Sequence, residues 1–81
     1  MKDDLTLRLG LVIRKLRLEL RLTQQGLASK AALHRTYISD VERGGRNVSI
    51  EILQRIARAL DKPLSDIFAL AEKPTESADL K

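Results

Sequence analysis

The chain contains no cysteine and almost no aromatic residues. Without cysteine it has no disulfide and no thiolate-based zinc site, which favours a reducing compartment. Tyr37 and Phe68 are the two aromatic residues, and tryptophan is absent. Proteins that grip single-stranded nucleic acid stack successive bases on several aromatic rings, and this chain lacks the rings for such a platform.

Residues that carry catalytic or metal chemistry are also scarce. His34 is the single histidine, and one imidazole does not make a metal site. The sequence has no nucleophile–histidine set, no carboxylate pair at a spacing suited to acid–base catalysis, and no phosphate-binding glycine loop. We therefore expect no enzymatic activity, no cofactor and no bound metal.

A long apolar run is missing as well. The first sixteen residues place two acidic residues at the start and interrupt the leucines with arginine. This pattern is neither that of a signal peptide nor that of a membrane span. We expect a soluble, cytoplasmic protein.

What the chain does have is an uneven excess of basic residues. Its 81 residues carry a net charge of +4, and 43% of them are hydrophobic, enough for one packed domain. Residues 1–60 hold 12 Lys and Arg against 6 Asp and Glu, whereas residues 61–81 hold 3 against 5. A basic body suits an anionic polymer, and the shortage of aromatic rings favours duplex DNA over a single strand.

Apolar residues recur at helical spacing throughout, and no segment alternates as a strand would, so the sequence predicts an all-α domain of five short helices. The first helix should begin after Asp3 or Asp4, either of which can cap its free amides. Its predicted core stripe is Leu5, Leu9, Val12, Ile13, Leu16 and Leu20. A second stripe, Leu7, Leu11 and Leu18, lies either in the core or against a partner.

The middle of the chain predicts two helices joined by a tight turn. Thr23 should cap the first, with Leu27, Ala28 and Ala31 facing inward. The second should span about residues 35–43, with Ile38 and Val41 facing the core and Gly44 and Gly45 ending it.

Two further helices complete the predicted domain. Ser49 should cap the fourth helix, with Glu51 in its first turn. Pro63 should end this segment, and the fifth helix should begin at Leu64 or Ser65. In the fourth helix the apolar residues at helical spacing are Ile52, Leu53, Ile56, Ala57 and Leu60. In the fifth helix the apolar residues are Ile67, Phe68 and Leu70. We place the domain at residues 1–72 and a polar tail at 73–81.

Residues 23–49 have the form of a helix-turn-helix whose second helix opens with Arg35 and Thr36. Such a helix fits the major groove of DNA. There the Arg35 guanidinium can donate two hydrogen bonds to guanine, and Thr36 can use its hydroxyl or its methyl group. Ser39 lies one helical turn further on the same face and is the third predicted base-reading residue.

Other polar residues are placed to hold the DNA backbone. The predicted backbone contacts are Gln24, Tyr37, Arg43, Arg46 and Asn47. For Tyr37, a half-buried core position is an equal alternative. Asp40 is interpreted first as a local salt-bridge partner, since a carboxylate near phosphates is costly. Arg17 and Glu42 are predicted to form a structural ion pair.

An ordered set of motifs over residues 8–70 resembles the Xre/lambda-repressor family of helix-turn-helix DNA-binding proteins. The motifs are IRKLR, LTQQGLA, YISDVERGGRNVS, LQRIARAL and KPLSDIF. HRTYIS followed by ERGGRN is most similar to the controller proteins of restriction–modification systems. The resemblance implies the compact lambda-repressor-like fold and the base-reading, backbone and ion-pair roles given above.

The same resemblance implies a homodimer that binds palindromic operators and regulates its own gene, with RNA polymerase as a further candidate partner. It assigns dimerisation to Leu64, Ile67 and Phe68. Three positions depart from the family pattern: His34 replaces a frequent serine or aspartate cap, Ala32 a frequent turn glycine, and Gly26 a usual helix former. Alternatives are a prophage-type repressor, an antitoxin-type autorepressor, or a protein-binding module that does not contact DNA.

Overall fold

The computed structural model describes residues 4–73 and contains five α-helices in that range and no strand. They are α1 (Asp4–Glu19), α2 (Gln24–Ala31), α3 (Arg35–Glu42), α4 (Ile50–Ala59) and α5 (Leu64–Glu72). The all-α prediction is confirmed. The predicted tail lies outside the described residues except for Lys73, and so does Asp3, one of the two predicted caps of α1.

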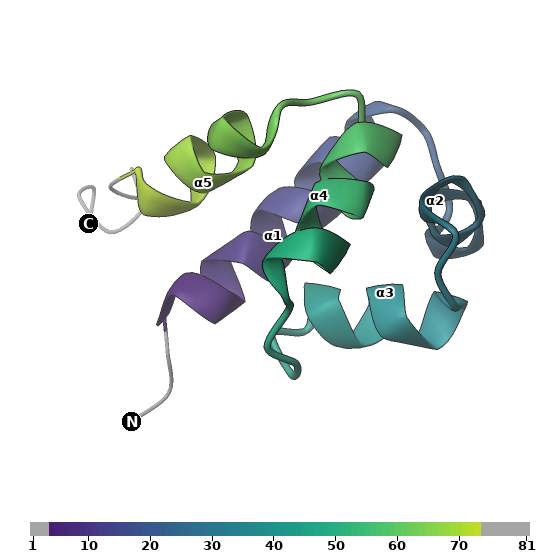
Figure 1. The fold of residues 1–81 in the computed structure, drawn as a ribbon, viewed down its shortest axis with the longest axis horizontal. Coiled ribbons are helices and arrows are strands. Elements are labelled where there is room, and N and C mark those ends of the chain that lie inside the picture. Colours follow the sequence, from purple (N-terminus) through teal and green to yellow (C-terminus); the bar gives the residue numbers. More distant parts are fainter. Residues whose placement is uncertain (1–3, 74–81) are drawn as a thin grey trace.

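Helix α1 lies at the centre of the arrangement. It packs against α5 on one side and α3 on the other, while α2 packs against α3 and α4. As a result, α2 and α3 form one end of the molecule and α5 lies at the other (Figure 1). Residues far apart in sequence therefore hold α3 in place.

The core consists of the aliphatic residues that helical spacing placed inward. Ile13, Leu27, Ile38 and Ile56 are completely buried. Ile52 and Phe68 are partly buried and pack against this cluster. The spacing of the apolar residues was therefore a sound guide to most of the core, although Leu70 of α5 is 39% exposed.

Two predictions about apolar residues are decided by the structure. Leu20 is 47% exposed, so its placement in the core was wrong. Helix α1 ends at Glu19, and the chain turns through Arg21 with a positive φ of 61°, which takes Leu20 off the helical stripe. In the other stripe, Leu7, Leu11 and Leu18 are 36%, 61% and 52% exposed, so these leucines lie on the surface of the single chain.

Two helices begin with the predicted cap, and histidine takes the cap position of a third. Thr23 Oγ1 accepts a hydrogen bond from the Gly26 amide at 2.9 Å, and Ser49 Oγ accepts from the Ile52 amide at 3.2 Å. At α3, His34 Nδ1 accepts from the Thr36 amide at 3.2 Å. Histidine therefore fills the cap position at the start of α3 with an acceptor nitrogen.

Glycine ends α3, as predicted. Gly44 has a φ of +73°, and its amide donates to Val41 at 3.0 Å while the Gly45 amide donates to Asp40 at 3.0 Å. These two bonds close the helix in a Schellman motif, which uses a left-handed residue that glycine adopts at little cost.

Gly10 permits a close approach between α1 and α3. A Cβ atom at this position would collide with the backbone carbonyl oxygen of Val41, and it would lie 2.8 Å from that of Glu42. The backbones of α1 and α3 therefore touch here. By contrast, a Cβ at Gly26 would meet only the side chains of Thr23 and Leu22, so no other helix approaches it closely.

Candidate nucleic-acid interface

The turn between α2 and α3 is tightly hydrogen-bonded although it lacks glycine. Ala32 takes the left-handed conformation, with a φ of 59°. Its amide donates to Ser29 at 3.2 Å, and the Leu33 amide donates to Ala28 at 2.8 Å. Alanine thus adopts the geometry for which glycine is usual, and α3 starts three residues later, at Arg35.

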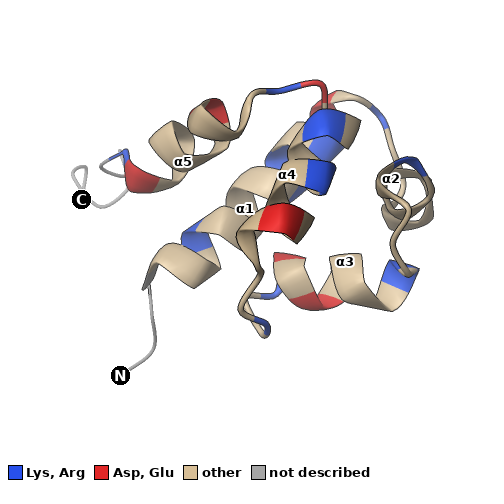
Figure 2. Cartoon of the chain, viewed as in Figure 1, with Lys and Arg blue, Asp and Glu red and all other residues tan. Residues whose placement is uncertain are grey.

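The predicted base-reading residues gather at the amino end and outer face of α3. Arg35 and Thr36 are exposed, and within residues 4–73 neither side chain has a hydrogen-bond or ion-pair partner. Ser39 is partly exposed and accepts a hydrogen bond from Arg43 Nη1 at 2.6 Å. Figure 2 shows a basic position at the amino end of α3 and acidic positions towards its other end.

A cluster of charged residues surrounds the carboxyl end of α3. Asp40 pairs with Arg43 through Oδ1 and with Arg46 through Oδ2, the latter at 3.0 Å. The Arg46 guanidinium also lies over the Tyr37 ring, 4.5 Å from its centroid. The hydrogen bond from Arg46 and the positive charge of both arginines hold the pKa of Asp40 below its ordinary value of 3.8. The interpretation of Asp40 as a salt-bridge partner is confirmed.

The remaining residues predicted to hold the DNA backbone differ in exposure. Tyr37 is half-buried and packs against the core, which is the alternative kept open above. Asn47 is exposed, and its Oδ1 accepts from Thr6 Oγ1 at 3.4 Å. Gln24 is half-buried, and its Nε2 donates to Glu42 Oε1 at 3.1 Å, so part of its amide faces the protein interior.

Arg17 and Glu42 form a bidentate ion pair in the interior. Arg17 Nε lies 2.6 Å from Glu42 Oε2, and Nη2 lies 3.0 Å from Oε1, with both residues less than 10% exposed. Arg17 Nη1 also donates to the Leu22 carbonyl at 2.8 Å. Together with Gln24, this network ties α1, the start of α2 and the end of α3 to one another.

The residues predicted for dimerisation do not share one environment. Ile67 is completely buried within the single chain. It belongs to the core because α5 packs its inner face against α1 and α4. Leu64 and Phe68 are half-buried, and they are the members of the predicted set that reach the surface.

Two residues that position the helix-turn-helix were missed in the sequence. Gly10 sets the distance between α1 and α3, and its signal was a glycine inside a helical leucine stripe, which costs about 1 kcal/mol relative to alanine. Arg55 on α4 donates from Nε to the Ala31 carbonyl at 3.1 Å and from Nη2 to the Ala32 carbonyl. Its signal was a basic residue between the core positions of α4.

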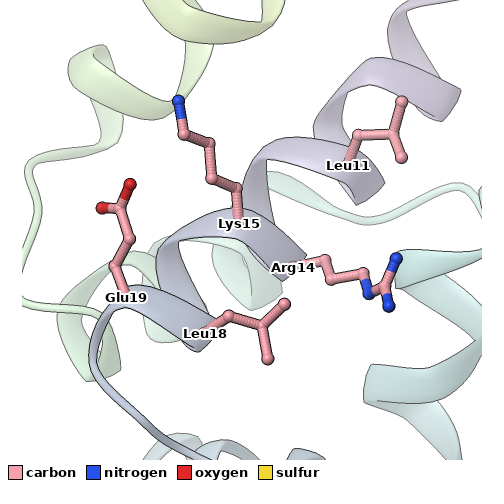
Figure 3. A pocket seen from close by; sticks show the side chains of 5 residues that line it. All are labelled: Leu11, Arg14, Lys15, Leu18 and Glu19. Carbon is pink, nitrogen blue, oxygen red and sulfur yellow. The ribbon is translucent and has the colours of Figure 1, made fainter.

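The outer face of α1 carries a shallow depression lined by both leucines and charged residues. Leu11, Arg14, Lys15, Leu18 and Glu19 line it, and Arg14 and Lys15 extend in different directions from the helix (Figure 3). Within residues 4–73, no group of three or more His, Cys, Asp or Glu is placed to hold a metal ion. No helix in this range is both long and apolar enough to cross a membrane.

Comparisons with known proteins agree with this architecture. Residues 13–67 match the family model described as helix-turn-helix. Control protein C.BamHI of Bacillus amyloliquefaciens is 41% identical over 69 residues, covering 84% of this chain and 85% of the relative. Control protein C.MunI of a Mycoplasma species is 40% identical over 72 residues, covering 88% and 97%.

A solved structure extends the likeness to three dimensions. C.Esp1396I bound to a 19 base pair DNA duplex superposes with a TM-score of 0.79 at 39% identity, covering 85% of this chain and 92% of that one. Other crystal structures describe C.Esp1396I as a restriction–modification controller protein. The chain therefore belongs to the Xre-like helix-turn-helix family, and within that family it is similar to the controller proteins of restriction–modification systems.

Proposed function

We propose that this protein is a sequence-specific, duplex-DNA-binding transcription regulator that acts as a homodimer on a palindromic operator, as a restriction–modification controller does. The observation that carries the proposal is the exposed, unpaired amino end of α3, which a buried network and a packed turn hold rigid. The names of the relatives, and the DNA duplex bound by C.Esp1396I, support it.

Base reading would fall to the outer face of α3. Arg35 has no ion-pair partner within residues 4–73, so its planar guanidinium can donate two bonds to the O6 and N7 atoms of one guanine. One such contact contributes about 1–3 kcal/mol of discrimination. Thr36 precedes Ser39 by about one helical turn, so both hydroxyls face the same groove as Arg35.

Contacts to the DNA backbone would come from the loop after α3 and from the start of α2. Arg43 and Arg46 are exposed and can exchange the carboxylate of Asp40 for phosphate oxygens. Asn47 lies beside them in the loop. Gln24 opens α2, where free backbone amides favour an anion. These contacts fix the orientation of α3 without reading sequence.

Dimerisation would double the number of base pairs read. One short helix reads few bases, and two copies related by a two-fold axis read two half-sites about 34–36 Å apart or a multiple of that spacing. The proposed contacts are Leu64 and Phe68, half-buried residues of α5. This helix lies at the end of the molecule away from α2 (Figure 1). RNA polymerase remains a candidate partner for a dimer bound upstream of a promoter.

Footprinting on the DNA directly upstream of the coding sequence tests this function. Two adjacent palindromes, filled one after the other as protein is added, support a controller that activates and then represses. One lone site favours a prophage-type or antitoxin-type autorepressor. No protection of any duplex would contradict the proposal and favour the protein-binding module.

Two variants, measured in the same footprinting assay, test whether Arg35 reads bases. Arg35→Ala should weaken binding to the protected site much more than binding to unrelated duplex. Arg58→Ala is the matched control, since this exposed arginine lies in the last turn of α4. Equal losses on both duplexes for Arg35→Ala would exclude base reading by this residue.

A further inference from the structure

We infer that Arg55 is a positioning residue for DNA reading, because it holds the turn of the helix-turn-helix in the shape that aims α3. The inference rests on the proposed function, in which α3 reads bases. Arg55 lies on α4, outside the helix-turn-helix, and needs no contact with DNA for this role. Its guanidinium reaches two consecutive carbonyls of the turn, those of Ala31 and Ala32.

These two carbonyls lie where the helix leaves acceptors without backbone partners. The last carbonyls of a helix have no amide ahead of them, and they form the negative end of its dipole. In this turn the amide of Ala32 donates a hydrogen bond to the Ser29 carbonyl, and the amide of Leu33 donates to the Ala28 carbonyl. The next acceptors therefore need an external donor, and a cation suits them best.

The conformation of Ala32 makes such a restraint useful. Its φ of 59° is costly for a residue with a Cβ atom, whereas glycine adopts it readily. A turn with this cost relaxes easily if nothing holds its carbonyls. Arg35 follows three residues later, so a change at Ala32 would move the start of the reading helix directly.

Arg55 is itself well anchored for this task. Its neighbours Leu53 and Ile56 are almost completely buried, and α4 packs directly against α2. The hydrogen bond from Arg55 Nε to the Ala31 carbonyl is partly buried, so water competes less for it than at a fully exposed site, whereas the bond to the Ala32 carbonyl is exposed. The Arg55 side chain thereby links the backbone of the turn to α4, which is itself packed in the core.

The opposite end of α2 has a parallel arrangement. Arg21 also takes a left-handed conformation, with a φ of 61°, and the carbonyl of the next residue, Leu22, accepts a hydrogen bond from Arg17. Arginines from α1 and α4 thus bind the backbone at both ends of α2. Arg55 serves the end that leads into α3.

The test compares binding to the operator duplex and to a scrambled duplex of equal length, each at the same series of salt concentrations, by fluorescence anisotropy. For Arg55→Ala we expect operator affinity to fall by about 5- to 150-fold, the range for losing the base contacts of one arginine, and scrambled-duplex affinity to change far less. Arg55→Lys should keep only part of the preference, since an ammonium is a poor replacement for a planar fork. Arg58→Ala should leave the preference unchanged.

A second variant separates positioning from simple loss of stability. Ala32→Gly removes the conformational cost of the turn, so Ala32→Gly combined with Arg55→Ala should regain part of the operator preference that Arg55→Ala loses. Circular dichroism establishes that each variant is folded. If Arg55→Ala does not fold, the comparison of Arg55→Lys with wild type decides, and an unchanged preference would overturn the inference.

One further outcome would contradict the inference about Arg55, and another would contradict the proposed function instead. Equal losses on both duplexes, with the salt slope reduced by about one, would make Arg55 a phosphate contact. Failure of wild type to prefer any duplex would instead sink the proposed function. Amide exchange at Leu33 would then decide the role of Arg55 in the turn, with faster exchange in Arg55→Ala supporting it and an unchanged rate overturning it.

Discussion

Helix α3 carries two carboxylates, Asp40 and Glu42, and each is paired with arginine in a different setting. They are two residues apart and so point about 200° apart around the helix. Glu42 faces inward and binds Arg17, and its side chain is 4% exposed. Asp40 faces outward and binds Arg43 and Arg46, and its side chain is 22% exposed.

The buried pair of Glu42 and the exposed pairs of Asp40 have the same chemistry, but burial gives them different roles. In the interior, water cannot take the place of Arg17, so loss of either partner leaves an uncompensated charge. At the surface, water and salt screen the pairs, and each arginine can move to a phosphate. The inner face of α3 therefore fixes the helix, and the outer face leaves its arginines available for the proposed contacts with DNA.

The largest effect is expected from breaking the buried side. Glu42→Ala leaves Arg17 buried without its partner and should lower the free energy of unfolding by about 3–5 kcal/mol. Urea denaturation measures this change. Replacing both, as Arg17→Met with Glu42→Leu, should recover much of the loss. A loss below about 1 kcal/mol for Glu42→Ala would show that this pair resembles an exposed one.

The contact between α1 and α3 should give the next largest effect. Gly10→Ala forces a methyl group against the carbonyls of Val41 and Glu42 and should destabilise the fold by about 1–3 kcal/mol. Gly26→Ala is the matched control, because it meets only side chains and gains helix propensity of about 1 kcal/mol. Equal thermal shifts for the two variants would contradict the close approach at Gly10.

On the outer face, substitution should change DNA binding more than stability. Asp40→Asn removes a negative charge beside the two arginines, so affinity for any duplex should rise several-fold while the unfolding midpoint changes little. Anisotropy titrations on operator and unrelated DNA measure both affinities. Weaker binding would instead mean that Asp40 orients Arg43 and Arg46 for their contacts.

The smallest expected effect is in the pH dependence of stability. The hydrogen bond from Arg46 and the charge of both arginines lower the pKa of Asp40 in the folded state below its ordinary 3.8. The stabilisation is therefore complete above that ordinary value and is lost as the pH falls through the lowered pKa. Wild type and Asp40→Asn should differ most above pH 3.8 and converge below it in thermal melts. A gap that widens on acidification would contradict this sign.

Local patterns in the sequence predicted most of the fold. Helical spacing placed Ile13, Leu27 and Ile38 in the core, and the caps at Thr23 and Ser49 were evident because a cap depends only on its next three residues. Leu20 was misplaced because periodicity does not show where a helix ends.

Features that depend on how helices meet were not predictable in this way. The contact that leaves no room for a side chain at Gly10 depends on the packed arrangement of α1 and α3. The hydrogen bond from Arg55 to the turn likewise depends on how α4 packs against α2. The ion pair between Arg17 and Glu42 was predicted, but the hydrogen bond from Gln24 to Glu42 was not. Tertiary contacts of single side chains are thus the part that the sequence leaves open.

Selection from a pool of random duplexes, carried out in parallel with wild type and Arg35→Ala, tests the central claim most directly. The claim is that the outer face of α3 reads DNA sequence. Wild type should enrich a motif with two-fold symmetry, and Arg35→Ala should enrich the same motif with one base pair in each half no longer specified. Enrichment of no motif by wild type, or of an identical motif by both proteins, would contradict it.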